Sequence, residues 1–199
     1  ILPIGNWVLK TACEKCKEWQ EKGLKPINMA VNFSVYQLKH PNIIEQTEDV
    51  LEKTSLDARY LEVEITESVE IDNINKCEKT LESIKKLGIT LAIDDYGKGY
   101  ASLERLKRLS IDKLKIDTSF VHGIGINDKD EKIIKGLISL AYSLGLKTVA
   151  EGVEKKEQVK FLNENACKKL QGYYFYKPMP AAEMESLLIQ NSPSLISYK

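Results

Sequence analysis

The sequence predicts an α/β protein with a parallel sheet, because helix-like and strand-like segments alternate along nearly the whole chain. The helix-like segments carry apolar residues at the spacing of one helix face, and the runs between them are short and rich in β-branched residues. A glycine follows three of these helices, at the point where a helix commonly ends. Helices that alternate with strands in this way are typical of parallel sheets covered by helices.

Seven helices are expected. The first, third and fifth stop at Gly23, Gly88 and Gly145, since glycine readily adopts the left-handed backbone that follows a last helical turn. The other helices are placed by the apolar periodicity of the segments that separate the strands. In chain order the predicted helices cover residues 6–22, 42–53, 73–87, 101–109, 129–144, 155–164 and 181–189.

Six strands are expected between these helices. Each is a short β-rich run, and most end in polar residues, as in Val-Asn-Phe-Ser and Glu-Ile-Thr-Glu. The predicted strands cover residues 27–34, 61–66, 90–96, 113–117, 147–153 and 169–176.

Side-chain alternation on the strands favours a barrel over a doubly wound open sheet, which six strands would also fit. On four strands the apolar residues share one face, and the residues that point the other way are Asn32, Glu64, Asp94 and Lys115. An open sheet covered on both faces should be apolar on both, whereas a barrel gathers polar groups at its C-terminal rim. The sequence therefore predicts a TIM-like (β/α)8 barrel lacking about its first two strands, over residues 1–190, followed by a polar tail at residues 191–199.

Composition limits the class of protein. The 199 residues are 43% hydrophobic, which suits one domain with a sizeable core. Lys plus Arg equals Asp plus Glu at 29 each, so no overall positive field attracts duplex nucleic acid or an anionic membrane. No apolar run is long enough to predict a membrane span, and we expect a cytoplasmic domain, although the full protein could be anchored through another segment.

Polar residues at four strand ends form a candidate site. They are Asn32, Glu64, the adjacent pair Asp94 and Asp95, and Glu151. Carboxylates held close together need compensation by raised pKa values, by Lys115 or by a divalent cation. Oxygen ligands without His or Cys select Mg²⁺ or Mn²⁺ over zinc, and adjacent aspartates can serve two ions. The pattern is therefore typical of a two-metal site for a phosphodiester.

Lys115 lies in Leu-Lys-Ile-Asp, on the inward face of its strand. It could be a Schiff-base nucleophile, as in barrel aldolases, or a cation that binds phosphate and orients water. A Schiff-base lysine needs a lowered pKa, whereas neighbouring carboxylates raise it. The second role is therefore favoured.

The other inward or rim residues are an aromatic run, a charged pair and a glycine-rich loop. The rings at 173–176 follow Gln171 and could stack a nucleobase, or at least two of them could be buried as alternate strand residues. Glu62 and Lys113 lie lower on the inward face, where we expect a structural pair. Residues 94–100 form a glycine-rich loop that could move while anchored at Asp94.

The cysteines and histidines receive no role in the chemistry. Cys13 and Cys16 have the spacing of half a zinc or redox site, but no second pair exists at ligand spacing. Their helical context predicts packed or free thiols in a reducing compartment. His40 and His122 stand alone in polar, turn-like contexts and are expected at the surface.

Six ordered motifs together resemble the EAL domain family of cyclic di-GMP phosphodiesterases, over about residues 4–188. They are Asn-x-Ser, Glu-x-Thr-Glu, Asp-Asp-aromatic-Gly-x-Gly, Leu-Lys-Ile-Asp, Ala-Glu-Gly-Val-Glu and Gln-Gly-Tyr. The resemblance implies hydrolysis of cyclic di-GMP to linear pGpG with two Mg²⁺ or Mn²⁺ ions. It also implies a homodimer and an upstream sensory or GGDEF-type domain.

The resemblance implies a role for each site residue. Glu151, Lys115 and Asp95 would be catalytic, and Lys115 and Gln171 would bind substrate or water. Glu67 and Glu154 would steady the mobile loop and the site. The implied metal ligands are Asn32, Glu64, Asp94 and Asp95.

The chain departs from the family pattern in the loop and at its start. Tyr96, Lys98 and Ala101 stand where the family usually has phenylalanine, a small residue and serine. The Glu-Ala-Leu glutamate, itself a metal ligand in the family, and a nearby substrate-binding arginine are absent from these residues. We expect a Glu-x-Leu roughly 30 to 40 residues before Ile1, judged from ordinary β/α unit lengths, and little activity from the 199 residues alone.

Two other functions are weighed against hydrolysis. A non-catalytic cyclic di-GMP receptor or scaffold of the same fold would require the upstream glutamate to be substituted. An unrelated barrel lyase or aldolase would use Lys115 as its nucleophile and could be trapped with borohydride.

Overall fold

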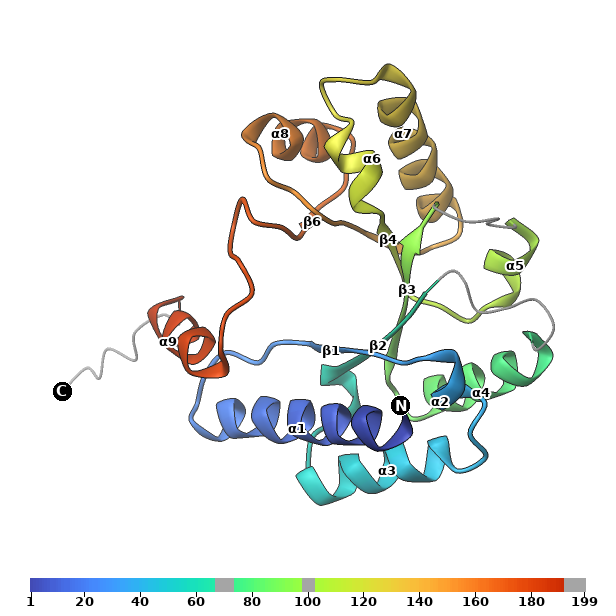
Figure 1. Ribbon diagram of the computed structural model, residues 1–199, viewed down its shortest axis with the longest axis vertical. Coiled ribbons are helices and arrows are strands. Elements are labelled where there is room, and N and C mark those ends of the chain that lie inside the picture. The colour runs from blue at the N-terminus through green and yellow to red at the C-terminus, as the bar shows by residue number, and fades with distance from the viewer. Residues whose placement is uncertain (67–73, 98–102, 192–199) are drawn as a thin grey trace.

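The computed structural model describes residues 1–66, 74–97 and 103–191 (Figure 1). Its sheet has six strands: β1 (Met29–Asn32), β2 (Leu61–Thr66), β3 (Thr90–Tyr96), β4 (Lys113–Ile116), β5 (Lys147–Ala150) and β6 (Lys169–Leu170). The α-helices are α1 (Leu2–Glu21), α2 (Val35–Leu38), α3 (Ile43–Thr54), α4 (Ile74–Lys86), α5 (Leu103–Arg108), α6 (Thr118–His122), α7 (Asp128–Ser143), α8 (Lys156–Glu164) and α9 (Ala181–Asn191). A short 3-10 helix, η1, covers Ala58–Tyr60.

The sheet confirms the predicted parallel β/α architecture. Each strand pairs in parallel with the next strand along the chain, in the order β1-β2-β3-β4-β5-β6. The strands form a curved wall with helices from α1 to α8 arranged around its outside, while α9 lies near the end of α1 (Figure 1). The described residues thus form a partial (β/α) barrel.

The predicted side-chain alternation is also confirmed. Val63, Leu91 and Leu114 face the helices and are fully buried in the main apolar cluster. The opposite, inward face is buried as well, but four of the buried side chains that it carries are charged: Glu62, Glu64, Lys113 and Lys115. Because a buried charge is costly without a partner, these residues must compensate one another.

Glu62 and Lys113 form the structural pair expected from the sequence. Their carboxylate and ammonium groups are in direct contact, and both residues are buried, at 5% and 6% exposure. Removing one partner of a buried ion pair leaves the other charge without compensation. The pair therefore stabilises the lower layer of the barrel interior only while both charges are present.

Replacing one member of this pair should be costly and replacing both should not. We expect Glu62→Gln to lower the free energy of unfolding by roughly 3 kcal/mol, because Lys113 stays buried and charged. Glu62→Gln combined with Lys113→Met should recover most of that loss. Urea denaturation of both variants measures the difference. If the double variant loses as much unfolding free energy as the two single variants together, the two charges are not coupled.

The last strand is shorter than predicted. β6 ends at Leu170, so residues 171–176 are not strand. Tyr173, Tyr174, Phe175 and Tyr176 are all exposed, so of the two interpretations of this run the structure contradicts burial of at least two rings. After Leu170 the chain leaves the sheet toward α9, so alternate residues no longer face a helix layer. α9 continues to Asn191, one residue past the predicted domain boundary, and the remainder of the predicted tail lies outside the described residues.

Two short helices were also missed. α2 begins after Ser34, whose side chain forms a reciprocal capping box with Gln37. α6 begins after Asp117, whose carboxylate accepts a hydrogen bond from the Ser119 backbone N–H. These helices have four and five residues, too few to show an apolar period.

The cysteines are packed, as predicted. Cys13, Cys16, Cys77 and Cys167 are all free and buried. Burial raises the pKa of the Cys13 thiol to about 12, and burial also raises the pKa of Cys16. Cys13 and Cys16 both belong to the main apolar cluster, so this pair is a packed element of α1.

The thiols of the native protein should react slowly. A pH of 8 is far below the Cys13 pKa of about 12, so the thiol stays protonated, and its side chain is fully buried. We expect a thiol-specific chromogenic reagent to label the native chain much more slowly than the chain in denaturant. Rapid labelling of Cys13 in the native chain, located by peptide mapping, would contradict this assignment.

No helix in the described ranges combines the length and the apolar character that a membrane crossing requires.

Candidate functional site

The centre of the candidate site is the ammonium group of Lys115. It lies 2.8 Å from a Glu64 oxygen, 3.0 Å from Asp94 Oδ1 and 2.8 Å from Glu151 Oε1. These residues come from β2, β3, β4 and the segment directly after β5, so the predicted convergence of strand ends is observed. Only 5% of the Lys115 side chain is exposed, and the ammonium is therefore shielded from water.

Burial and charge oppose each other at this centre. Burial lowers the pKa of Lys115, but hydrogen bonds with Glu151, Glu64 and Asp94 outweigh that effect and hold its pKa above the ordinary value. Burial raises the pKa of Glu64 and of Glu151, and the nearby ammonium only partly offsets this. A raised lysine pKa disfavours the neutral amine that a Schiff-base mechanism requires, and this argues against the lyase interpretation.

A second grouping joins the acids themselves. Oxygen atoms of Asp94, Asp95 and Glu151 all lie within 4.8 Å of one another. The Asp95 backbone N–H donates to Asp94 Oδ1 at 3.0 Å, and Asp95 itself has a positive φ of 54°. A left-handed backbone is uncommon for aspartate and marks a site where the surrounding structure dictates the conformation.

The strand register explains how these side chains meet. The pairing of β3 with β4 shifts between Ile93 and Tyr96, across the two aspartates. Such an irregularity re-aims side chains, and here it lets two consecutive residues approach one centre. Glu151 follows β5, and its N–H donates to the Ile116 carbonyl at 3.2 Å, beside Lys115.

A hollow of about 320 Å³ adjoins Glu151 at this end of the strands. Its lining residues are Thr118, His122, Glu151, Gly152, Glu154, Gln171, Gly172 and Tyr173. Gly152 has φ +67°, and a Cβ there would lie 2.3 Å from a Thr118 methyl carbon. A Cβ on Gly172 would lie 2.2 Å from the Val153 backbone. Both glycines are therefore required for the close approach of these segments around Glu151.

The remaining predicted residues lie at varying distances from the centre. Asn32 is exposed at the end of β1, where it is the register partner of Glu64. Gln171 is exposed, and its N–H donates to the Ala150 carbonyl at 2.8 Å, which places it beside Glu151. Glu154 is exposed, with Oε1 3.9 Å from His122 Nε2. Glu67, Lys98 and Ala101 lie outside the described residues, as does the end of the predicted loop, residues 98–100.

The sequence reasoning missed Thr118 and His122. His122 is at the surface as predicted, with 47% of its side chain exposed, but it lines the hollow beside Glu151 and Glu154. Its position in the sequence could have predicted this, because His122 follows the Leu-Lys-Ile-Asp strand by one helical turn. Residues that follow a barrel strand lie at the rim that carries the site.

Comparison with known proteins supplies the family. The EAL domain profile matches residues 1–178. This chain belongs to the EAL domain family. The resemblance inferred from the six motifs is thereby confirmed.

Relatives of this EAL domain include characterised proteins. It is 39% identical over 190 residues to the signaling protein YkoW of Bacillus subtilis, covering 96% of this chain and 24% of that protein. It is also 39% identical over 185 residues to the cyclic di-GMP phosphodiesterase NbdA of Pseudomonas aeruginosa, covering 93% of this chain and 24% of NbdA. The chain thus spans about a quarter of the length of these curated relatives.

Solved EAL structures have the same fold. The MucR phosphodiesterase in complex with c-di-GMP superposes with a TM-score of 0.88 at 37% identity, covering 92% of this chain and 74% of that one. The EAL domain of Mycobacterium smegmatis DcpA gives a TM-score of 0.90 at 37% identity, covering 95% of this chain and 85% of that one. These matches confirm the barrel fold predicted from the strand alternation.

Proposed function

We propose that this EAL domain is the catalytic part of a phosphodiesterase that hydrolyses cyclic di-GMP to linear pGpG with Mg²⁺ or Mn²⁺. The observation that carries the proposal is the arrangement around Lys115, where one buried ammonium contacts three carboxylates. The similarity to the cyclic di-GMP phosphodiesterase NbdA and to the MucR phosphodiesterase in complex with c-di-GMP supports cyclic di-GMP as the substrate.

The residues present fit a divalent cation. Glu64, Asp94, Asp95 and Glu151 together with Lys115 carry a net charge of −3 when all are ionised, so one ammonium does not neutralise the cluster. Asp94 and Asp95 would hold the metal, with Asn32 and Glu64 as further oxygen donors, and this donor set suits Mg²⁺ or Mn²⁺. When bound, the metal supplies charge stabilisation of the phosphate and acidifies water.

The side chains of this domain carry out the other steps. With Glu64 and Asp94 engaged as metal ligands, the Lys115 ammonium would be released to bind a phosphate oxygen and orient the attacking water. Glu151 accepts a proton from that water as its oxygen forms the new bond to phosphorus. The bond from phosphorus to the ribose 3′ oxygen then breaks, and the proton that Glu151 accepted passes through water to that oxygen to give the 3′-hydroxyl of pGpG. Gln171 hydrogen-bonds the water or the substrate from the adjoining hollow, and Glu154 supports that side.

The proposal includes a longer protein that forms a homodimer. We propose that upstream residues complete the barrel with a Glu-x-Leu strand and connect it to a sensory or GGDEF-type domain. The relatives of about fourfold greater length support the presence of further domains, since this chain covers 24% of each.

The direct test measures the products of purified protein incubated with cyclic di-GMP. The chain with its natural upstream sequence and Mg²⁺ or Mn²⁺ should yield pGpG, identified by chromatography against a standard, and chelation should stop the reaction. The 199 residues alone should give little product. Tight binding of cyclic di-GMP without any hydrolysis by the longer protein would refute the enzymatic proposal and support a receptor.

A further inference from the structure

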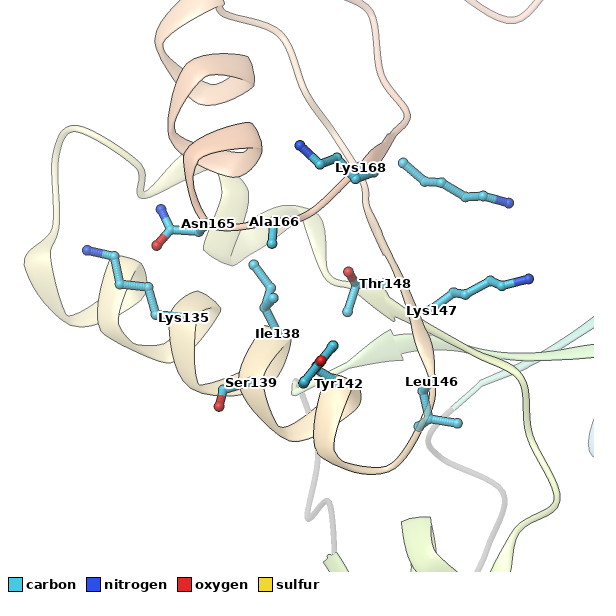
Figure 2. A pocket seen from close by; sticks show the side chains of 11 residues that line it. Lys135, Ile138, Ser139, Tyr142, Leu146, Lys147, Thr148, Asn165, Ala166 and Lys168 are labelled. Atoms are coloured by element: carbon cyan, nitrogen blue, oxygen red, sulfur yellow. The ribbon is translucent and has the colours of Figure 1, made fainter.

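A second hollow lies on the outer face of the barrel, away from the candidate site. It has a volume of about 620 Å³ and lies between α7, the start of β5 and the turn from α8 to β6 (Figure 2). Lys147 and Lys169 begin β5 and β6, whereas Glu151 and Gln171 follow the ends of those same strands. An occupant of this outer hollow would therefore leave the rim that carries Glu151 accessible.

The floor of the outer hollow is largely apolar. Ile138 and Leu146 contribute aliphatic surface, and the Tyr142 ring is 85% exposed beside them. Figure 2 shows Ile138, Thr148 and Tyr142 between α7 and the turn that carries Ala166. An exposed aromatic ring next to aliphatic floor residues is typical of a surface that covers an apolar side chain of a partner.

The charged residues that line the outer hollow are all lysines. They are Lys135, Lys147, Lys168 and Lys169. Within the described ranges, none of them has a carboxylate within ion-pair distance, although the chain as a whole carries no net charge. Lys135 and Lys168 are exposed beside the floor, and Lys135 Nζ lies 5.2 Å from the centre of the Phe161 ring. Lys147 is the register partner of Lys113, so it points to the inward face of the barrel. Lys169 points the same way, because its pKa is lowered by burial and by the charge of Lys113.

The lysines extend to different sides of the strands. Lys135 and Lys168 extend on the side of α7 and α8 in Figure 2, and Lys147 extends on the other. Only Lys135 and Lys168 therefore flank the apolar floor, and a small ligand would need a more enclosed pocket. A polypeptide segment can place an apolar side chain on the floor and carboxylates beside these two lysines.

We propose that the outer hollow docks an acidic segment of a partner protein, which inserts an apolar side chain against Ile138 and Tyr142 and pairs its carboxylates with Lys135 and Lys168. The proposal rests on charge complementarity and on the apolar floor, and it does not depend on hydrolysis at the other end of the strands. Electrostatic complementarity of this kind sets partner choice and speeds association.

The test selects binders without assuming a partner. A random peptide library displayed on phage is panned against the folded chain, and enriched peptides are synthesised with a fluorescent label. We expect sequences with a large apolar residue flanked by Asp or Glu. Their dissociation constants, measured by anisotropy, should rise by about tenfold in Lys135→Glu/Lys168→Glu, which corresponds to about 1.4 kcal/mol. Tyr142→Ser should also weaken binding, since the ring is 85% exposed and its loss does not disturb the core.

The control is Lys86→Glu/Lys129→Glu, which reverses two exposed lysines outside the hollow. It should leave the dissociation constant unchanged, and thermal melts should show that every variant is folded. Enriched peptides that lack acidic residues, or that bind Lys135→Glu/Lys168→Glu as well as the original chain, would overturn the proposal, as would a failure to enrich any peptide. A dimer in sedimentation experiments that dissociates in the same variant would assign the hollow to a second copy instead.

Discussion

Replacing Lys115 with methionine is expected to abolish cyclic di-GMP hydrolysis and to lower the free energy of unfolding by roughly 3 to 5 kcal/mol. The ammonium contacts Glu64, Asp94 and Glu151 at 2.8 to 3.0 Å and is the cation that these carboxylates share. Methionine has a similar length but no charge, so three carboxylates would remain close together without compensation. The proposed contact with the phosphate would be lost at the same time.

The two effects of Lys115→Met can be separated. Urea denaturation gives the change in stability, and activity is measured at low temperature and divided by the folded fraction. Lys86→Met, at an exposed position of α4, is the matched control and should change neither quantity. Added Mn²⁺ should stabilise the variant more than the original chain, because its acid cluster is more negative. Normal turnover by folded Lys115→Met would remove Lys115 from the proposed mechanism.

Asp94→Asn is expected to lower turnover by roughly 10²- to 10⁴-fold while the protein stays folded. Asparagine keeps the shape of aspartate and can still accept the Asp95 N–H and hydrogen-bond to Lys115. It removes one negative charge from the group formed by Asp94, Asp95 and Glu151. The loss should therefore appear as weaker metal binding and a lower kcat rather than as unfolding.

The measurement for Asp94→Asn combines three readouts: kcat for pGpG formation, the metal concentration at half-maximal activity, and the urea midpoint. Glu82→Gln removes an exposed carboxylate of α4 and serves as the control, with no expected change in any readout. Full activity at the same metal concentration would rule out Asp94 as a metal ligand. A large fall in the urea midpoint would instead indicate that Asp94 is mainly structural.

The strands were most accurately predicted where local sequence and tertiary packing agree. β2 and β3 have the predicted bounds of 61–66 and 90–96, because their alternate apolar residues are buried under helices. β6 was predicted too long, since the tyrosine-rich run after Leu170 has strand propensity but no neighbouring strand to pair with in the described chain. Strand propensity is decided by such pairing and packing more than by the residues themselves.

The sequence by itself determined the order of the six strands and the inward position of Glu62, Glu64, Lys113 and Lys115, because these follow from residue type and a period of two along each strand. It also determined the family, through six motifs in order. Only the tertiary structure decided which groups touch. The shared contact of Lys115 with three carboxylates, the left-handed Asp95 and the two hollows depend on strand register, on the irregularity in β3 and on the path of the chain after β6. Those features arise between segments far apart in the sequence, where no local pattern specifies distance.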